Sequence, residues 1–276
     1  MVRQRKEGRP DDQGATVPVG MAPPRSLAEL QSRAARVVQE LAQAEQVRLV
    51  GGYASVASAR GVLGEYLPWE GRIYLDDGEV TRHLRAIVAQ GLKASEYPSA
   101  ANALATLNHE LIHALGPMDV GADYGVAVVL NEEGLDPPNP GPRFIEEGIT
   151  ELWTGRTFQR FITELELPPL APWLANINVA SAYIGPESQV HPLLTMAAAA
   201  TGEPENEILK LLAREVPNTR SRRFASHLLV AGGRNPPPES EIRTIAAIFD
   251  TFLDYRIVVP EADHGIQAAR AIAKIL

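Results

Sequence analysis

The chain has 276 residues, of which 45% are hydrophobic, and its formal net charge at pH 7 is −8. This length is sufficient for one large domain or two closely packed ones, and the negative charge excludes the basic surface that is typical of nucleic-acid-binding proteins. The chain contains no cysteine, which excludes disulfides and thiolate ligands, so a bound metal would need histidine, aspartate or glutamate ligands.

The first residues are rich in charge, glycine and proline. Met1 to Gly20 begins basic and contains no apolar stretch of the kind found in secretory signals, and the apolar run from Thr195 to Thr201 is too short to span a bilayer. We therefore expect a protein without a membrane span that is cytoplasmic by default, with export by a signal-independent route as the alternative. Residues 1–24 are expected to form a disordered leader.

Helices and strands are mixed in the part of the chain that follows. Ser26 and Glu29 form a capping box at the start of an amphipathic helix. Gly116 and Pro117 end another helix, because glycine suits a left-handed C-terminal position and proline cannot continue the helix. The hydrophobic spacing predicts helices over 26–46, 79–91 and 99–115 and strands over 47–53 and 71–75.

Helices dominate the rest of the chain. Residues 117–141 are irregular and rich in proline and glycine, and Pro142 or Arg143 begins a helix that runs to about 164. Further helices are predicted at about 186–201, 204–215, 218–231, 238–254 and 262–275. We expect an α+β fold, mainly helical, with a lobe over 25–165 that holds a small sheet and a helical lobe over 166–276.

The sequence His109-Glu110-Leu111-Ile112-His113 lies within the predicted helix 99–115. Histidines four residues apart lie on one face of a helix, so both imidazoles can bind one Zn²⁺ at about 2.0–2.1 Å. Glu110 follows the first histidine and can take a proton from the attacking water. This HExxH pattern predicts a catalytic zinc site.

A catalytic zinc normally has a third protein ligand, and the next helix offers two carboxylates for it. Glu146 and Glu147 are adjacent, and helical spacing alone does not distinguish them. Glu147 has a second carboxylate, Glu151, four residues later on the same face, whereas Glu146 has Thr150 at that position. A carboxylate of this kind commonly accepts the second ring N–H of a metal-bound histidine.

An HExxH helix followed by a helix with the pattern E-G-x-x-E resembles the gluzincin metallopeptidases. The resemblance covers Ala105 to Thr154. It implies a zincin-like catalytic lobe, Glu147 as the third zinc ligand, and Glu151 as the partner of His109. It also implies that the strand near Gly71 to Leu75 forms the rim of the cleft, where an extended substrate pairs with its edge. The segment between His113 and Glu147 is long and irregular, which argues against a close relative of thermolysin. The metzincin pattern, in which a third histidine follows the HExxH motif, is absent.

The donor that stabilises the oxyanion is not fixed by the sequence. Tyr183, in a segment before a helix, is the favoured catalytic candidate, with Tyr124 and His191 as alternatives. The arginines Arg220, Arg222 and Arg223 are expected to form a solvated helix face.

These patterns predict a zinc metallopeptidase that hydrolyses peptide bonds through a zinc-activated water, with a peptide or protein as substrate and no nucleic-acid partner. The metal ligands are His109, His113 and Glu147, and Glu110 is the catalytic base. The alternative is a zinc-bound zincin-fold module that binds or regulates a partner without proteolysis. A helical interaction protein without metal is a third hypothesis. The oligomeric state is left open.

Overall fold

The fold is described from a computed structural model, which covers residues 22–57, 63–68, 70–115, 141–177, 184–215, 217–252 and 264–276. Within these residues the protein is mainly helical and contains one small three-stranded sheet. This agrees with the predicted α+β, mainly helical class. Of the predicted leader, residues 1–21 lie outside the described residues.

Helix α1 (Leu27–Ala42) begins where the sequence predicts and ends earlier. The Ser26 hydroxyl accepts a hydrogen bond from the Glu29 backbone N–H at 3.2 Å, which satisfies one of the free donors at the helix start. Gln43 then adopts a left-handed conformation with φ of 52°, so the helix does not continue to residue 46. The buried face of α1 consists of Leu30, Ala34, Val37, Val38, Leu41 and Ala42.

The sheet contains β1 (Gly52–Val56), β2 (Gly64–Leu67) and β3 (Arg72–Asp76) in the order β1-β3-β2. Strand β3 pairs in parallel with β1 and antiparallel with β2. The strand predicted over 47–53 corresponds to β1, which lies closer to the C-terminus, at Gly52–Val56. Strand β2 was not predicted. The expectation that the strand at 71–75 offers a free edge was wrong, because β3 is the central strand.

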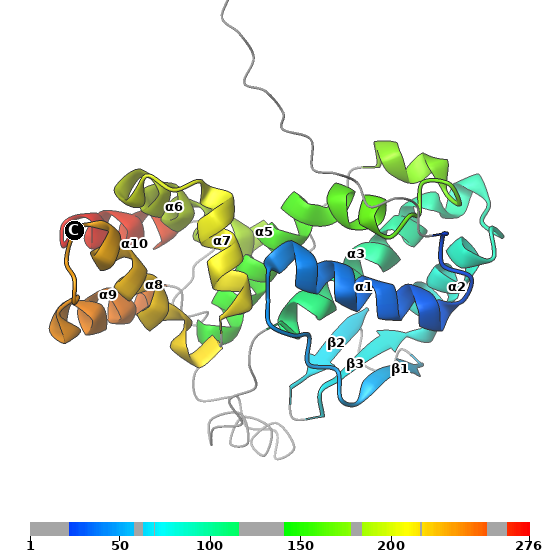
Figure 1. Cartoon of the computed structure of the whole chain (residues 1–276), viewed down its shortest axis with the longest axis horizontal. Helices are drawn as coiled ribbons and strands as arrows, with labels where there is room; N and C mark the ends of the chain where they lie inside the picture. The colour runs from blue at the N-terminus through cyan, green and yellow to red at the C-terminus, as the bar shows by residue number, and fades with distance from the viewer. Residues whose placement is uncertain are drawn as a thin grey trace, which may run out of the picture.

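Helix α3 (Tyr97–His113) packs on this sheet. The chain enters it through a π-helical turn (Asp77–Thr81), α2 (Arg82–Val88) and a short 3-10 turn (Ala94–Glu96). Alanines and leucines make up most of its buried residues, and the small alanines allow neighbouring elements to approach closely. Its contacts include α1, α2, α5 and β2. Figure 1 shows the sheet on one side of α1 and α3, at the end of the molecule away from the C-terminal helices.

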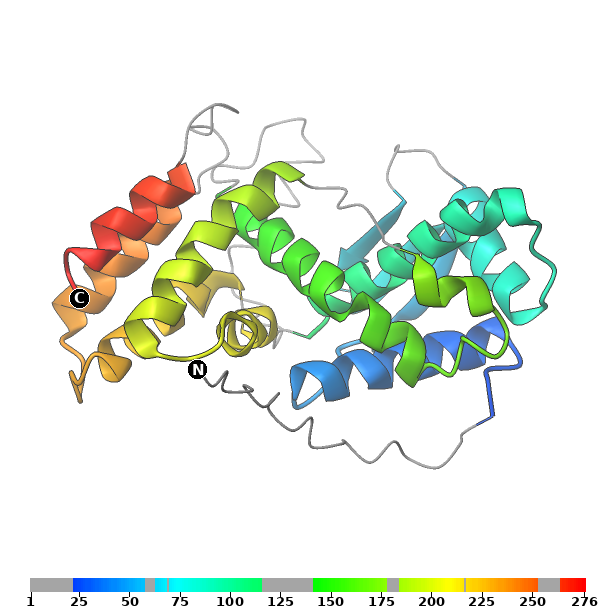
Figure 2. The same cartoon turned by 90° about the horizontal axis from the view of Figure 1, so that it is seen from above.

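Helix α5 (Gly141–Glu164) connects the two ends of the molecule. It contacts α3 on one side and α6, α7 and α8 on the other, and Figure 2 shows it running between the two groups. A 3-10 turn (Pro172–Asn176) follows α5. The remaining helices of the described residues are α6 (Ile184–Thr201), α7 (Glu205–Arg214), α8 (Pro217–Ala231), α9 (Glu239–Phe252) and α10 (His264–Ala273). All five lie within two residues of the predicted bounds. The division into two lobes near residue 165 stays a prediction.

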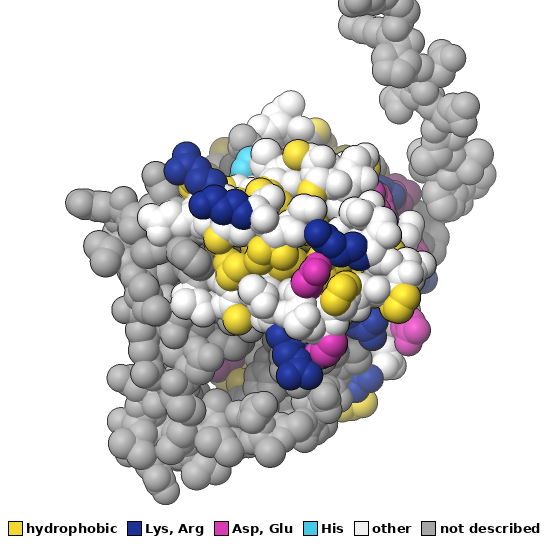
Figure 3. Space-filling model, turned by 90° about the vertical axis from the view of Figure 1, so that its left-hand side faces the viewer, with side chains coloured by type: hydrophobic (Ala, Val, Ile, Leu, Met, Phe, Trp, Pro, Cys, Tyr) yellow, Lys and Arg dark blue, Asp and Glu magenta, His cyan; other side chains and the backbone are white. Residues whose placement is uncertain are grey.

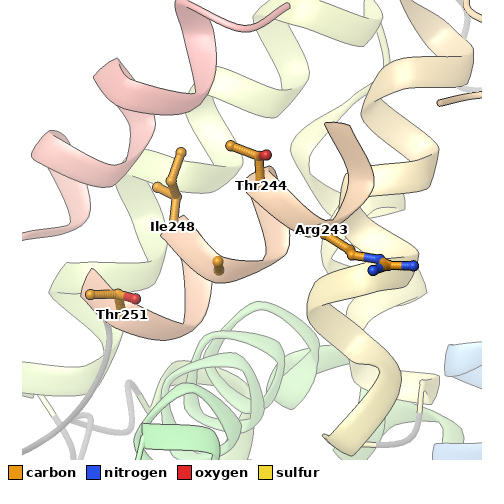
Figure 4. Close-up of a pocket in the computed structure, with 5 residues that line it drawn as sticks. Arg243, Thr244, Ile248 and Thr251 are labelled. Atoms are coloured by element: carbon orange, nitrogen blue, oxygen red, sulfur yellow. The ribbon is translucent and has the colours of Figure 1, made fainter. Parts of the chain in front are cut away.

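The end of the molecule formed by the C-terminal helices carries apolar side chains bordered by charged ones (Figure 3). A shallow pocket on α9 is lined by Arg243, Thr244, Ala247, Ile248 and Thr251 (Figure 4). None of these five side chains is a carboxylate or an imidazole, so the pocket offers no metal ligand. None of the described helices combines the length and the apolar character that a bilayer crossing requires.

Candidate metal centre

The last turns of α3 and the first turns of α5 place two histidines opposite three glutamates. His109 and His113 are one helical turn apart, and α3 packs against α5, which carries Glu146, Glu147 and Glu151. His109 is 6% exposed and Glu151 is 8% exposed. Buried charges of this kind need partners, and each of these side chains contacts another member of the group.

Three of these side chains direct one ligand atom each toward a common point. Glu147 Oε2 lies 3.1 Å from His109 Nε2 and 3.6 Å from His113 Nε2. The two Nε2 atoms are 3.1 Å apart. A tetrahedral Zn²⁺ at about 2.0–2.1 Å from its ligands places those ligands about 3.3 Å apart. His109, His113 and Glu147 therefore form a group that could hold a metal ion.

The other ring nitrogen of each histidine faces a carboxylate. His109 Nδ1 lies 3.0 Å from Glu151 Oε2, and His113 Nδ1 lies 2.9 Å from Glu146 Oε1. An imidazole that donates its Nδ1–H to a carboxylate presents the Nε2 lone pair on the opposite side. These two contacts therefore favour the tautomer in which both Nε2 atoms can bind a cation.

The electrostatics of the group favour positive charge between the three ligand atoms. Burial alone would lower the pKa of His109, but its hydrogen bonds with Glu147 and Glu151 outweigh burial and raise that pKa. The pKa of His113 is raised well above 6.5, because Glu146 and Glu147 outweigh the same effect of burial. The pKa of Glu147 is lowered, because both histidines overcome the opposing effect of its burial. A bound cation would replace the protons that these shifts favour.

Glu146 has a different place from Glu147, which separates the two candidate ligands. Its Oε1 contacts Nδ1 of His113, on the side of the ring away from the ligand atoms, and its Oε2 accepts a hydrogen bond from Arg220. Burial would raise the pKa of Glu146, but Arg220 and His113 lower it to about 2. The geometry therefore places Glu147 among the ligand atoms and Glu146 behind His113.

Glu110 lies beside the group without belonging to it. Its side chain is 6% exposed, and burial raises its pKa against the opposing charges of His109 and His113. The backbone of Tyr66 on β2 also opposes the effect of burial on this pKa. Gly64 of the same strand leaves little space, because a Cβ atom there would lie 2.8 Å from Glu110 Cγ. The edge strand β2 thus covers Glu110, a contact that the sequence did not predict.

Of the three candidates for the oxyanion donor, only His191 lies within the described residues. Tyr183 and Tyr124 lie outside the described residues, so their role stays a prediction. His191 lies on α6 with its side chain 55% exposed, and its charged neighbour is Glu205 at 4.0 Å. His191 therefore lies on the solvent-exposed surface of α6.

The expectation for Arg220 was wrong. Its side chain is buried and contacts Glu146, whereas Arg222 and Arg223 on the same helix are exposed as predicted. A sequence signal was present, because Arg220 precedes the buried Phe224 and Leu228 at intervals of four residues and so shares their helix face.

Comparison of the chain with family models, with curated proteins and with solved structures finds no match. The resemblance to gluzincins therefore depends on the motif residues alone, and the assignment of a function depends on the geometry of this group.

Proposed function

We propose that the chain is a zinc-dependent metallopeptidase. The observation that carries the proposal is the convergence of His109 Nε2, His113 Nε2 and Glu147 Oε2 within 3.1–3.6 Å of one another. Among the described residues only these three side chains converge, which would leave a coordination position open as in catalytic zinc sites, whereas structural sites close it with a fourth ligand. Glu110 next to the group supplies the acid/base residue that a purely structural site does not need.

Zinc is the metal that these three ligands and the neighbouring Glu110 favour. Two imidazoles and one carboxylate suit zinc, although the same donors also occur in non-haem iron sites. The HExxH position of Glu110, directly after the first ligand, favours hydrolysis over oxygen chemistry. When bound, zinc would polarise the substrate carbonyl and lower the pKa of a water molecule.

Glu110 is the group that moves the proton. In the proposed reaction its carboxylate takes a proton from the attacking water and then transfers it to the leaving amine. Burial raises the pKa of Glu110. A higher pKa makes the carboxylate a better acceptor for the proton of the attacking water at neutral pH. Glu151 and Glu146 hold His109 and His113 in orientation, so the ligands need no rearrangement.

The test combines metal content with peptide cleavage. Elemental analysis should find about one zinc per chain in the parent and in Glu110→Gln, and a clear loss of zinc in Glu147→Ala, which removes a ligand. Cleavage is measured by mass spectrometry on a library of unmodified peptides. Glu110→Gln preserves the shape and removes the base, so we expect a loss of at least about 10²–10⁴-fold in cleavage rate.

Each other outcome has a definite meaning. A parent that holds zinc but cleaves no peptide would favour the binding or regulatory module. Glu110→Gln that cleaves as fast as the parent would refute the role of this carboxylate. Iron in place of zinc would overturn the choice of metal. Folded parent without any metal after zinc is supplied would overturn the metal centre itself.

A further inference from the structure

The buried arginine Arg220 links the metal centre to the C-terminal helices. Its side chain is 4% exposed. Its Nε donates to the Leu212 carbonyl at 2.7 Å and its Nη2 donates to the Glu215 carbonyl at 3.0 Å, both at the end of α7. Its Nη1 donates to Glu146 Oε2 on α5. One guanidinium on α8 thus joins the end of α7 to the start of α5.

Glu146 continues this connection to a metal ligand. One of its oxygens accepts from Arg220, and the other faces His113 Nδ1 at 2.9 Å. The hydroxyl of Thr150 lies 3.4 Å from the same nitrogen. A continuous series of polar contacts therefore runs from Nδ1 of His113 through Glu146 and Arg220 to the backbone of α7.

Packing alone does not explain this arrangement. A buried ion pair gains little stability over well-packed apolar residues of similar volume, because the cost of removing both charges from water offsets their attraction. The ion pair between Arg220 and Glu146 does fix the orientation of the two side chains. A planar guanidinium with three fixed partners holds the Glu146 carboxylate in one orientation, and the carboxylate then holds the imidazole ring.

We propose that Glu146 and Arg220 are positioning residues that orient His113 for metal binding and couple helices α7 and α8 to the metal centre. This inference rests on the proposed function only in requiring that a metal binds at His109, His113 and Glu147. It predicts that changes in the C-terminal helices alter metal affinity although those helices supply no ligand atom among the described residues.

Arg222 provides a matched control on the same helix. It also pairs with a glutamate, Glu239, but its side chain is 50% exposed. Exposed pairs of this type contribute little, because water screens them. Arg220→Met and Arg222→Met therefore remove the same charge from one helix at a buried and at an exposed position.

The experiment measures zinc affinity of the full-length chain by competition with a chromophoric chelator, together with the visible absorption spectrum after cobalt replaces zinc. We expect Arg220→Met to weaken zinc binding by about 10–100-fold and to change the cobalt spectrum, as loss of a residue that supports a ligand typically does. Arg222→Met should match the parent within about twofold. Arg220→Lys, which keeps the charge but loses the planar fork, should lie between them.

A second variant tests whether weaker zinc binding results only from a loss of stability. Arg220→Met alone leaves Glu146 buried without its cationic partner, whereas Glu146→Leu with Arg220→Met removes both charges, and such replacements are commonly neutral for stability. The double variant should therefore keep the melting temperature of the zinc-free parent and still bind zinc about 10–100-fold more weakly.

The outcomes separate this inference from the proposed function. Parental zinc affinity and cobalt spectrum in a folded double variant would overturn the positioning role and leave the peptidase proposal intact. A parent that binds zinc without cleaving peptides would refute the peptidase proposal, and the loss of affinity in Arg220→Met would still support the positioning role. A parent that binds no zinc would overturn both.

Discussion

Gly64 on β2 lies against the proposed general base, so Gly64→Ala should disturb Glu110 without altering a metal ligand. An added Cβ would lie 2.8 Å from Glu110 Cγ, 2.9 Å from Glu110 Oε1 and 2.8 Å from Thr106 Cγ2. Ordinary contact begins at 3.4 Å, so the strand and the carboxylate must separate by about 0.6 Å.

The structure sets the size of the expected effect. A misplacement of about 1 Å in a catalytic group can reduce the rate about 100-fold, so a shift of about 0.6 Å should reduce kcat by roughly 10-fold. Crowding of a packed region costs about 1–3 kcal/mol, which should lower the melting temperature by several degrees. Zinc affinity should change little, because the three atoms nearest to the added Cβ belong to Glu110 and Thr106 and not to a proposed ligand.

The assay compares peptide cleavage, zinc affinity and thermal unfolding in Gly64→Ala and Gly78→Ala. Gly78 is the control, because a Cβ there would find its nearest neighbour, Asp76 Oδ1, at an ordinary 3.5 Å. Adding Thr106→Ser to Gly64→Ala removes one crowded methyl group and keeps the hydroxyl that bonds to the Asn102 carbonyl. Stability should then recover in part, while cleavage stays low because Glu110 is still displaced.

Parental activity and stability in Gly64→Ala would refute the reasoning, since β2 could not then be packed on Glu110. Loss of zinc together with activity would also contradict it, because the crowding is directed at the base and not at the ligands.

Two further predictions follow from the histidine contacts. Glu151→Ala removes the partner of His109 Nδ1 and should weaken zinc binding by about 10–100-fold, as measured by chelator competition. The control Glu164→Ala, at the exposed end of α5, should leave zinc affinity unchanged. Equal zinc affinities of the two variants would show that the contact between Glu151 and His109 is unimportant. The pKa values of His109 and His113 are raised above 6.5 by their carboxylate partners, against burial, so zinc must displace protons at pH 7. Zinc affinity should therefore rise with pH between about 6 and 8, and calorimetry in two buffers of different ionisation enthalpy should detect proton release, whereas affinity independent of pH would contradict the assignment.

Local spacing in the sequence determined most of the helices and the central motif. Helical periodicity and capping depend on residues within a few positions of one another, so α3, α5 and the five C-terminal helices were predicted with small errors. The i,i+4 relation of His109 to His113, and of Glu147 to Glu151, is likewise a property of one helix. These local relations were sufficient to predict the two histidines and the helix that carries the third member of the group that could hold a metal ion.

Only the tertiary structure decided how the two helices meet. Glu146 and Glu147 are adjacent in the sequence, and the packing of α5 on α3 and α8 sends one carboxylate to Arg220 and the other to the two Nε2 atoms. Strand β2 is four residues long and carries no strong pattern of its own, so its place over Glu110 depends on pairing with β3. Contacts between residues 33 to 74 positions apart arise from packing, which no local pattern encodes.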